Sequence, residues 1–218
     1  MLTDFWPLFG LRINTPRLEL RLASDDELAD LAQVAADGVH EADRMPFLTP
    51  WTDGTPAERA RSVLQWQWRQ RAEWLPGDWS LPFTVFHEGR PLGVQEISAQ
   101  DFAVRREVLT GSWLGLRHQG RGFGTEMRAA ALELAFVGLA SEECVSAAFE
   151  DSHASLEVSR RLGYRDDGVS RRTRRDRVVV EHRLRLTHER WSAHRRTAAS
   201  ITGLEPCLPM FGIGTPER

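Results

Sequence analysis

The chain has 218 residues and a formal net charge of −3, with 41% hydrophobic and 27% charged residues. This composition is typical of a globular protein with a sizeable core, and it excludes a global electrostatic attraction to nucleic acid or anionic membranes. All 28 basic side chains are arginine, which excludes lysine-based chemistry such as Schiff-base formation. The two cysteines, Cys144 and Cys207, form no CxxC pair, which speaks against a bound metal and fits a reducing cytoplasm.

The first quarter of the chain predicts one strand and two helices. Residues 17–22 (RLELRL) alternate apolar and polar side chains, as a half-buried strand does. Ser24 and Glu27 have the spacing of a capping box, which predicts a helix start. Thr55, followed by proline and by glutamate three residues on, predicts a second helix that runs to about Trp74. No stretch is long and apolar enough to span a membrane, and the start lacks the pattern of a signal peptide.

Three strand-like runs come next, and a tight turn at Gly89 joins the first two. After a glycine-rich stretch, helical spacing continues to about Gly138, and residues 144–149 (CVSAAF) predict a short buried strand. A short helix follows, and then a hairpin that turns near Asp176. This order predicts an α+β domain with a mixed, mostly antiparallel sheet of seven strands over residues 12–191. Residues 192–218 are expected to form a tail, irregular or partly helical, that is either mobile or packed as an arm.

The glycine-rich stretch, GRGFG, lies between a predicted strand and a predicted helix. Gly120, Gly122 and Gly124 would let an anion approach the backbone, and the first amides of a helix have no partners within it. The stretch is neither a GxGxxG fingerprint nor a P-loop, since position 125 is Thr and GK[ST] is missing. Read alone, it is either an anion-binding turn or a plain strand–helix connection.

Four stretches in the same order resemble the GCN5-related N-acetyltransferases, over about residues 13–191. QGRGFG is similar to the acyl-CoA-binding motif [QR]-x-x-G-x-[GA] of that family, with Gln119, Gly122 and Gly124 in the motif positions. TPRLELR and GSWLGL resemble the first and fourth strands of the Rim-type branch, whose members acetylate ribosomal proteins. DSHASLEVSRRLGY resembles the later helix of the family.

The resemblance implies a splayed sheet with acetyl-CoA as co-substrate, inserted where the fourth and fifth of the expected strands diverge. It implies attack on the thioester by an amine, either a small amine or a protein N-terminus. It further implies a bacterial, cytoplasmic enzyme. The residues expected to contact the cofactor are Trp113, Leu114, Leu116, Gln119, Gly120, Arg121, Gly122, Phe123, Gly124, Thr125, Ser152 and Ser155. Phe47 and Trp51 are expected to border the acceptor site.

The proton donor is where the sequence departs from the family pattern. Many members carry Tyr five residues before the last aromatic of the later helix, and here that residue is Ser159. A serine hydroxyl is a poor acid, so Ser159 would at most hydrogen-bond the sulfur, and Ser155 is the second candidate. The plain alternative for both serines is a capping or surface role on a helix.

Four residues are candidates for the base that deprotonates the amine: Glu96, Glu107, Glu150 and His182. Strand alternation places Val94 and Glu96 on one face of the sheet, and Gln95 on the other face. A carboxylate inside a cleft can have a raised pKa, and Glu96 is the preferred candidate. The alternative for each acid is a solvated strand face.

Two further readings stay open at this point. Without a tyrosine acid, the domain could bind acyl-CoA as a sensor or interaction module without turnover. The arginine-rich stretch SRRTRRDR, residues 170–177, could contact RNA, although a solvated basic edge is the expected role and nucleic acid is not the expected partner. A homodimer through the tail is also left open.

Overall fold

The computed structural model describes residues 1–195 and 197–214. Their strands are β1 (Arg12–Asn14), β2 (Glu19–Arg21), β3 (Asp78–His87), β4 (Arg90–Gln100), β5 (Glu107–Leu114), β6 (Glu143–Phe149), β7 (Arg165–Arg174), β8 (Arg177–Thr187) and β9 (Ser200–Thr202). Their α-helices are α1 (Leu2–Phe5), α2 (Asp25–Asp37), α3 (Pro56–Ala72), α4 (Phe102–Arg105), α5 (Phe123–Glu133), α6 (His153–Arg161) and α7 (His188–His194). Short 3₁₀ turns occur at Pro7–Gly10, Leu116–His118 and Glu205–Phe211, and a π-helical turn, Leu134–Gly138, extends α5.

In these residues the strands form one mixed sheet in the order β7-β8-β6-β5-β4-β3-β2-β1-β9. Every neighbouring pair is antiparallel except β5 and β6, which run parallel. The predicted class, a mixed and mostly antiparallel sheet flanked by helices, is therefore confirmed. The α5 helix supplies the crossover that a parallel pair requires.

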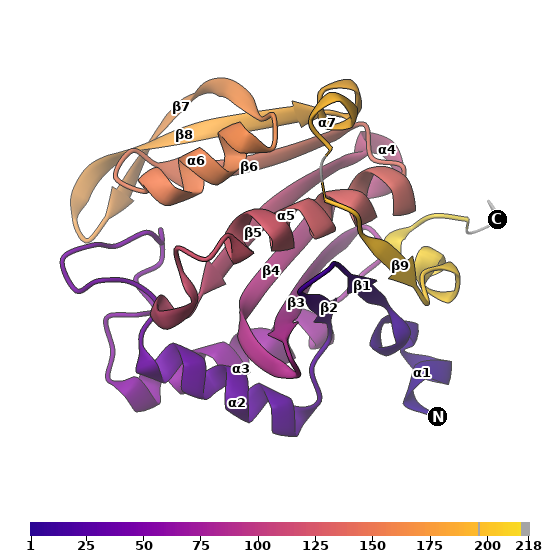
Figure 1. Cartoon of the computed structure of the whole chain (residues 1–218), viewed down its shortest axis with the longest axis horizontal. Helices are drawn as coiled ribbons and strands as arrows, with labels where there is room; N and C mark the ends of the chain where they lie inside the picture. Colours follow the sequence, from indigo (N-terminus) through magenta and orange to yellow (C-terminus); the bar gives the residue numbers. More distant parts are fainter. Residues whose placement is uncertain (196, 215–218) are drawn as a thin grey trace.

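The pairing of β5 with β6 stops early. It covers Glu107–Thr110 against Glu143–Ser146, yet β5 continues to Leu114 and β6 to Phe149. Beyond this point β5 remains paired only with β4, and β6 only with β8. The sheet therefore splits into two arms, with β6, β7 and β8 together at the top of Figure 1. We call the opening between residues 111–114 and 147–149 the fork.

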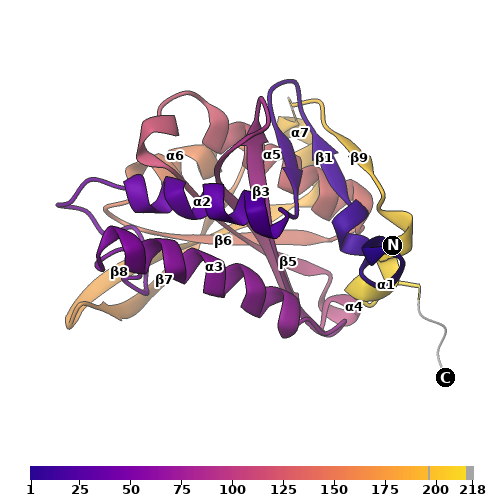
Figure 2. The ribbon, with the colours of Figure 1, turned by 90° about the horizontal axis from the view of Figure 1, so that it is seen from below.

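Helices cover the sheet on both faces. Figure 1 shows α5 crossing in front of β4 and β5. Figure 2, seen from below, shows α2 and α3 side by side on the other face. The larger apolar core lies under α5 and α6, and a smaller one lies between α2, α3 and the sheet. The fork thus lies between two helical layers.

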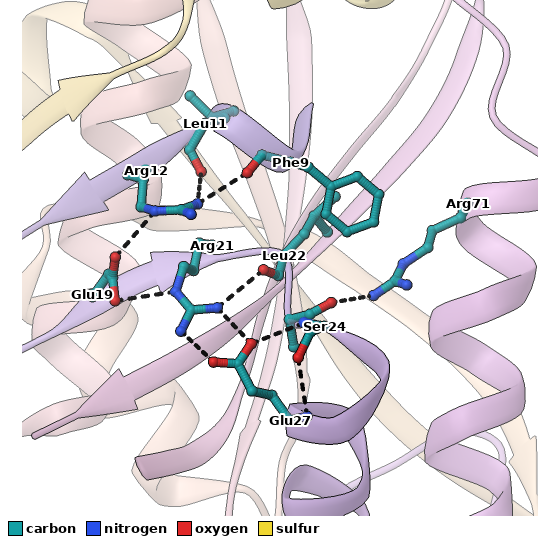
Figure 3. A network of polar contacts seen from close by, with 10 residues as sticks. Phe9, Leu11, Arg12, Glu19, Arg21, Leu22, Ser24, Glu27 and Arg71 are labelled. Atoms are coloured by element: carbon teal, nitrogen blue, oxygen red, sulfur yellow. Dashed lines mark hydrogen bonds and ion pairs between the residues drawn. The ribbon is translucent and has the colours of Figure 1, made fainter. Parts of the chain in front are cut away.

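The predicted capping box at the start of α2 is present, and the predicted helix start at Thr55 forms one as well. The backbone amide of Glu27 donates to Ser24 Oγ at 3.3 Å, and the Ser24 amide donates to Glu27 Oε2 at 2.9 Å. The same carboxylate also accepts hydrogen bonds from both terminal nitrogens of Arg21, at 2.7 and 2.6 Å (Figure 3). These hydrogen bonds connect β2 to the start of α2. The hydrogen bond from Arg21 lowers the pKa of Glu27 to about 2. Thr55 and Glu58 form the equivalent box at α3.

The strand count differs from the sequence-based prediction, because nine strands replace seven. The additional strands, β1 and β9, have three residues each and pair with one another. The predicted first strand is also shorter, since only Glu19–Arg21 of residues 17–22 pair in β2. Three residues are too few for an alternating pattern to stand out, so tertiary pairing defines these strands rather than local sequence.

The described part of the tail packs against the domain. Strand β9 extends the sheet edge, and Phe211 and Cys207 are fully buried. The Phe211 ring lies 4.9 Å from that of Trp79 and 5.6 Å from that of Trp74, in edge-on contacts. The segment up to residue 214 is therefore a packed arm. Among the described helices, none has the length and apolar character needed to cross a membrane.

Replacing Phe211 by Ala should lower the free energy of unfolding by about 3–5 kcal/mol, because it empties an aromatic site in the core. Urea unfolding monitored by tryptophan fluorescence measures the loss. Phe5→Ala is the matched control, since Phe5 is 87% exposed, and its effect should stay within about 0.5 kcal/mol. Equal effects of the two substitutions would contradict a structural role for the arm.

Candidate active site

The glycine turn lies at the open end of the fork, between β5 and α5. Gly120 and Gly122 have φ angles of 72° and 81°, in the region that favours glycine. Gly122 is the residue that precedes the first turn of α5, and no side chain caps that helix end. The amides of the first turn are thus left for another acceptor, and the positive end of the helix dipole faces the turn. The geometry is suited to an anion.

A network of side chains braces this turn. Gln119 Nε2 donates to the backbone carbonyls of Val39, at 2.8 Å, and of Leu114, at 3.0 Å. Arg17 Nη1 donates to the carbonyl of Arg121 at 3.1 Å, and the Arg17 guanidinium also pairs with Glu126. The side chain of Gln119 therefore fixes the backbone around the glycine turn, whereas the motif alone suggested a contact with the cofactor. Sequence reasoning missed Arg17 and Glu126 altogether, because they lie 109 residues apart.

The edge of β5 that faces the fork belongs to residues 111–114. Trp113 and Leu114 are on this edge, and their side chains point to opposite faces of the sheet, toward the α2–α3 core and the α5 core respectively. On the other edge, β4 approaches so closely that a Cβ at Gly93 would lie 2.2 Å from the carbonyl oxygen of Trp113. One edge of β5 is thus tightly held and the other is open.

A cavity of about 480 Å³ opens on the α3 side of the sheet, next to the end of the β5–β6 pairing. Its lining includes Trp66, one arginine and four acidic residues: Arg105, Glu73, Asp78, Glu96 and Glu107. Because the four acids outnumber the one arginine, a positively charged group would be favoured here. The cavity reaches both β5, at Leu109, and β6, at Val145.

Glu96 lies on the wall of this cavity. Its carboxylate accepts a hydrogen bond from Ser80 Oγ at 2.8 Å, and burial raises its pKa. It is paired across the sheet with Gly111, where a Cβ would lie 3.9 Å from Glu96 Oε2. The predicted alternation is confirmed: Val94 shares the face of Glu96 and packs in the α2–α3 core, and Gln95 lies on the opposite face.

The other base candidates lie in different surroundings. Glu107 also borders the cavity, but it forms ion pairs with Arg105 at 2.5 Å and Arg185 at 2.9 Å. Glu150 is exposed in the loop that follows β6. His182 is on β8, paired with Ala148. Of the four candidates, only Glu96 combines a cavity wall, burial and a raised pKa.

Ser159 lies on the opposite face of the sheet, on the buried side of α6, and is fully buried. Its hydroxyl donates to the carbonyl of Ser155 at 3.0 Å and accepts from Arg128 Nη1 at 3.0 Å. Because its proton is already engaged by a carbonyl, the hydroxyl has none to offer in this arrangement. Ser155 and Ser152 lie at the N-terminal end of α6, and both are partly exposed.

Arg128 is a further residue that sequence reasoning missed. It lies one turn after Gly124, and its spacing to Leu132 and Ala135 places it on the buried face of α5. In the sequence, a charged residue at the spacing of the apolar face of this helix was the signal that could have identified Arg128.

Phe47 and Trp51 lie in the loop between α2 and α3, on the same face as the cavity. Their rings are 5.2 Å apart, and Trp51 lies 5.7 Å from the ring of Trp113 on β5. The structure thus brings these two residues to the fork-facing strand.

The tip of the β7–β8 hairpin reaches the same α2–α3 loop. Arg175 pairs with Asp53 of the loop, and Arg174 donates to the carbonyl of Met45. Arg174 also pairs with Asp151 at 2.7 Å, and Arg172 with Glu181 at 2.9 Å. Three of the five arginines in residues 170–177 therefore have carboxylate partners. These partners weaken the case for RNA and give the stretch a structural role.

A split mixed sheet with a helix start and glycine turn at its opening defines the architecture of an acyl-CoA-dependent acyltransferase. Comparison with known families agrees: residues 17–165 match the acetyltransferase (GNAT) domain. The chain therefore belongs to the GNAT acetyltransferase family, and it is an N-acetyltransferase that uses acetyl-CoA.

Solved structures with the same fold include RimJ of Mycobacterium smegmatis in complex with CoA-disulfide. It is 18% identical, with a TM-score of 0.71, over 88% of this chain and 97% of that one. A ribosomal-protein-serine acetyltransferase structure from Vibrio cholerae is 19% identical, with a TM-score of 0.63, over 81% and 97%. The microcin C7 self-immunity acetyltransferase MccE, in complex with acetyl-CoA and AMP, is 14% identical, with a TM-score of 0.62, over 79% and 93%. These neighbours share the fold of this chain.

Glu96→Gln should stabilise the protein more at pH 7.5 than at pH 4.5. The folded-state pKa of Glu96 is raised, so the folded state holds its proton more tightly than the unfolded chain does. The wild-type protein therefore loses stability as pH rises from the ordinary carboxylate pKa through the raised value, and glutamine does not. Urea unfolding at both pH values measures the difference. Glu88→Gln, in an exposed turn, is the control, and a pH-independent difference for Glu96→Gln would contradict the burial of its charge.

Proposed function

We propose that the protein transfers the acetyl group of acetyl-CoA to a primary amine by direct attack within a ternary complex. The observation that carries the proposal is the fork, where the open edge of β5 lies between the glycine turn and the Glu96 cavity. An extended pantetheine arm can follow this edge, as an added strand would. The thioester then reaches the point where β5 and β6 part.

The pyrophosphate is assigned to the turn of residues 119–125. Free amides at the start of α5 and the positive helix end favour it, and Arg121 adds a charge to the turn. The pantetheine arm is assigned to Trp113, Leu114 and Leu116, with Ser152 and Ser155 on its other side. Gly120 and Gly124 leave room for the cofactor, because a Cβ at Gly120 would meet nothing within 4 Å and one at Gly124 only ordinary contacts.

Glu96 is assigned as the base. The attacking nitrogen must lose a proton as the C–N bond forms, and a carboxylate with a raised pKa can accept it directly or through water. Glu96 faces the cavity across from Gly111, which lies at the start of the fork. A backbone amide of β5 in residues 111–114 would stabilise the oxyanion. The amine thus approaches from the α3 side of the sheet.

The acceptor is proposed to be a protein N-terminal α-amine. The cavity has carboxylates for a protonated amine and aromatic walls for neighbouring side chains, and Phe47 and Trp51 lie on the same face. The names of the RimJ and ribosomal-protein-serine acetyltransferase neighbours favour this acceptor class over small amines. Both cysteines are free and buried, which is compatible with a cytoplasmic location.

Gly124→Glu should abolish the stabilisation of the protein by acetyl-CoA. The new carboxylate adds bulk and like charge beside the proposed pyrophosphate site. In the wild-type protein, acetyl-CoA at a hundredfold excess over Kd should add about 2.7 kcal/mol, seen as a higher melting temperature. Gly77→Glu is the matched control, because Gly77 is exposed and a Cβ there meets nothing within 4 Å. Full stabilisation of Gly124→Glu would overturn the placement of the cofactor.

Glu96→Gln should lower kcat by about 10²–10⁴-fold while acetyl-CoA still binds, because removal of a general base acts on the chemical step. Release of free CoA thiol, measured with peptides of different N-terminal residues and with small amines, gives the rate and identifies the acceptor class. Turnover at the wild-type rate in Glu96→Gln would remove Glu96 from the mechanism. Turnover with small amines but not with peptides would show that the acceptor is a small amine and not a protein N-terminus.

A further inference from the structure

Arg128 carries a buried charge that lacks a counterion in the described structure. Its side chain is 4% exposed, and none of the ion pairs found among the described residues includes it. Its hydrogen bonds go to three neutral hydroxyls: Ser159 at 3.0 Å, Ser112 at 3.1 Å and Ser146 at 3.3 Å. The Nε atom has no partner.

Burying the Arg128 charge without a counterion lowers the stability of the folded protein. Removing a guanidinium from water carries a large free-energy cost, and hydrogen bonds to neutral hydroxyls offset only part of it. An arginine stays protonated under these conditions, so the charge persists. A buried cation that has only neutral partners among the described residues can stabilise an anion placed beside it.

The hydroxyl ligands place this charge at the apex of the fork. Ser146 is the last residue of β6 that pairs with β5, and Ser112 lies two residues beyond Thr110, the last paired residue of β5. Ser159 approaches from α6. Ser112 and Ser146 lie on the face of the sheet that α5 covers, whereas Glu96 lies on the opposite face. The cation and the proposed base therefore flank the point where the thioester is expected.

The reaction forms an anion at this point. As the amine nitrogen bonds to the thioester carbon, the C–S bond breaks and its electron pair goes to the CoA sulfur, while the amine proton passes to Glu96 or to water. The resulting thiolate requires a proton or a positive charge nearby. The other titratable groups on the α5 side are poor donors: burial raises the pKa of both Tyr164 and Cys144, and Tyr164 shares a hydrogen bond with Thr110.

We propose that the Arg128 guanidinium faces the CoA sulfur and stabilises the leaving thiolate, held in place by Ser112, Ser146 and Ser159. This inference rests on the proposed cofactor site, and it gives Ser159 a positioning role in place of an acid. No proton needs to be transferred, because charge alone stabilises the sulfur. The thiolate takes up its proton from solvent after CoA is released.

The test uses CoA and acetyl-CoA as probes, so it needs no acceptor. An opposite charge within reach lowers a thiol pKa by about 1–3 units, so the protein should bind thiolate CoA more tightly than thiol CoA. The affinity for CoA, divided by that for acetyl-CoA, should rise about tenfold or more between pH 6.5 and pH 9. Acetyl-CoA has no ionisable thiol, so the ratio cancels the titration of Glu96 and other protein groups. Titration calorimetry measures both affinities.

Arg128→Met should bind acetyl-CoA but lose this pH-dependent preference, and Arg128→Lys should retain part of it because the charge remains. Arg71→Met, which removes a partly buried arginine on α3, should behave as the wild-type protein does. A wild-type ratio that does not change with pH, or a Met variant that keeps the change, would overturn the role of Arg128. Failure of the wild-type protein to bind acetyl-CoA at all would instead overturn the proposed function. Thermal unfolding confirms that each variant is folded.

Discussion

The parting of β5 and β6 after Thr110 and Ser146 is the constraint on which the rest of the structure depends. Two parallel strands that stop pairing leave backbone donors and acceptors without partners, and that costs free energy unless something replaces them. Each strand stays paired on its other edge, β5 with β4 and β6 with β8. The open edge of β5 is the place where the proposed pantetheine arm would add as an extended strand.

The apex of the fork is fixed by side chains. Thr110 Oγ1 donates to the carbonyl of Val145, and Ser146 Oγ donates to the carbonyl of Thr110, both at 3.3 Å. Gln95 Nε2 of β4 donates to the carbonyl of Gly111 on β5 at 2.9 Å, which adds a side-chain contact between these two strands. Further out, Gln119 and Arg17 set the glycine turn relative to β5. These contacts hold the split sheet in shape without a ligand.

Local signals in the sequence were sufficient for much of this fold. Capping boxes predicted the starts of α2 and α3, and the turns at Gly89 and Asp176 predicted the two long hairpins. Alternation predicted that Glu96 and Gln95 face opposite sides. The contacts between distant segments were out of reach, because no local pattern encodes which short segments meet. Strands β1 and β9, Phe211 in the core, Arg17 against Glu126 and the hairpin tip against the α2–α3 loop all belong to that group.

The roles of Arg128 and of the three serines around it depend on one another. Considered alone, Ser159 suggests that the proton donor is missing, since a serine hydroxyl is a weak acid. In the structure, Ser112, Ser146 and Ser159 are small enough to leave space for a guanidinium, and each supplies an oxygen that accepts from it. A larger side chain at any of the three positions would fill the volume that the guanidinium occupies. The small serines and the long arginine are thus complementary in both volume and hydrogen bonding, so a change at one position alters what the others can do.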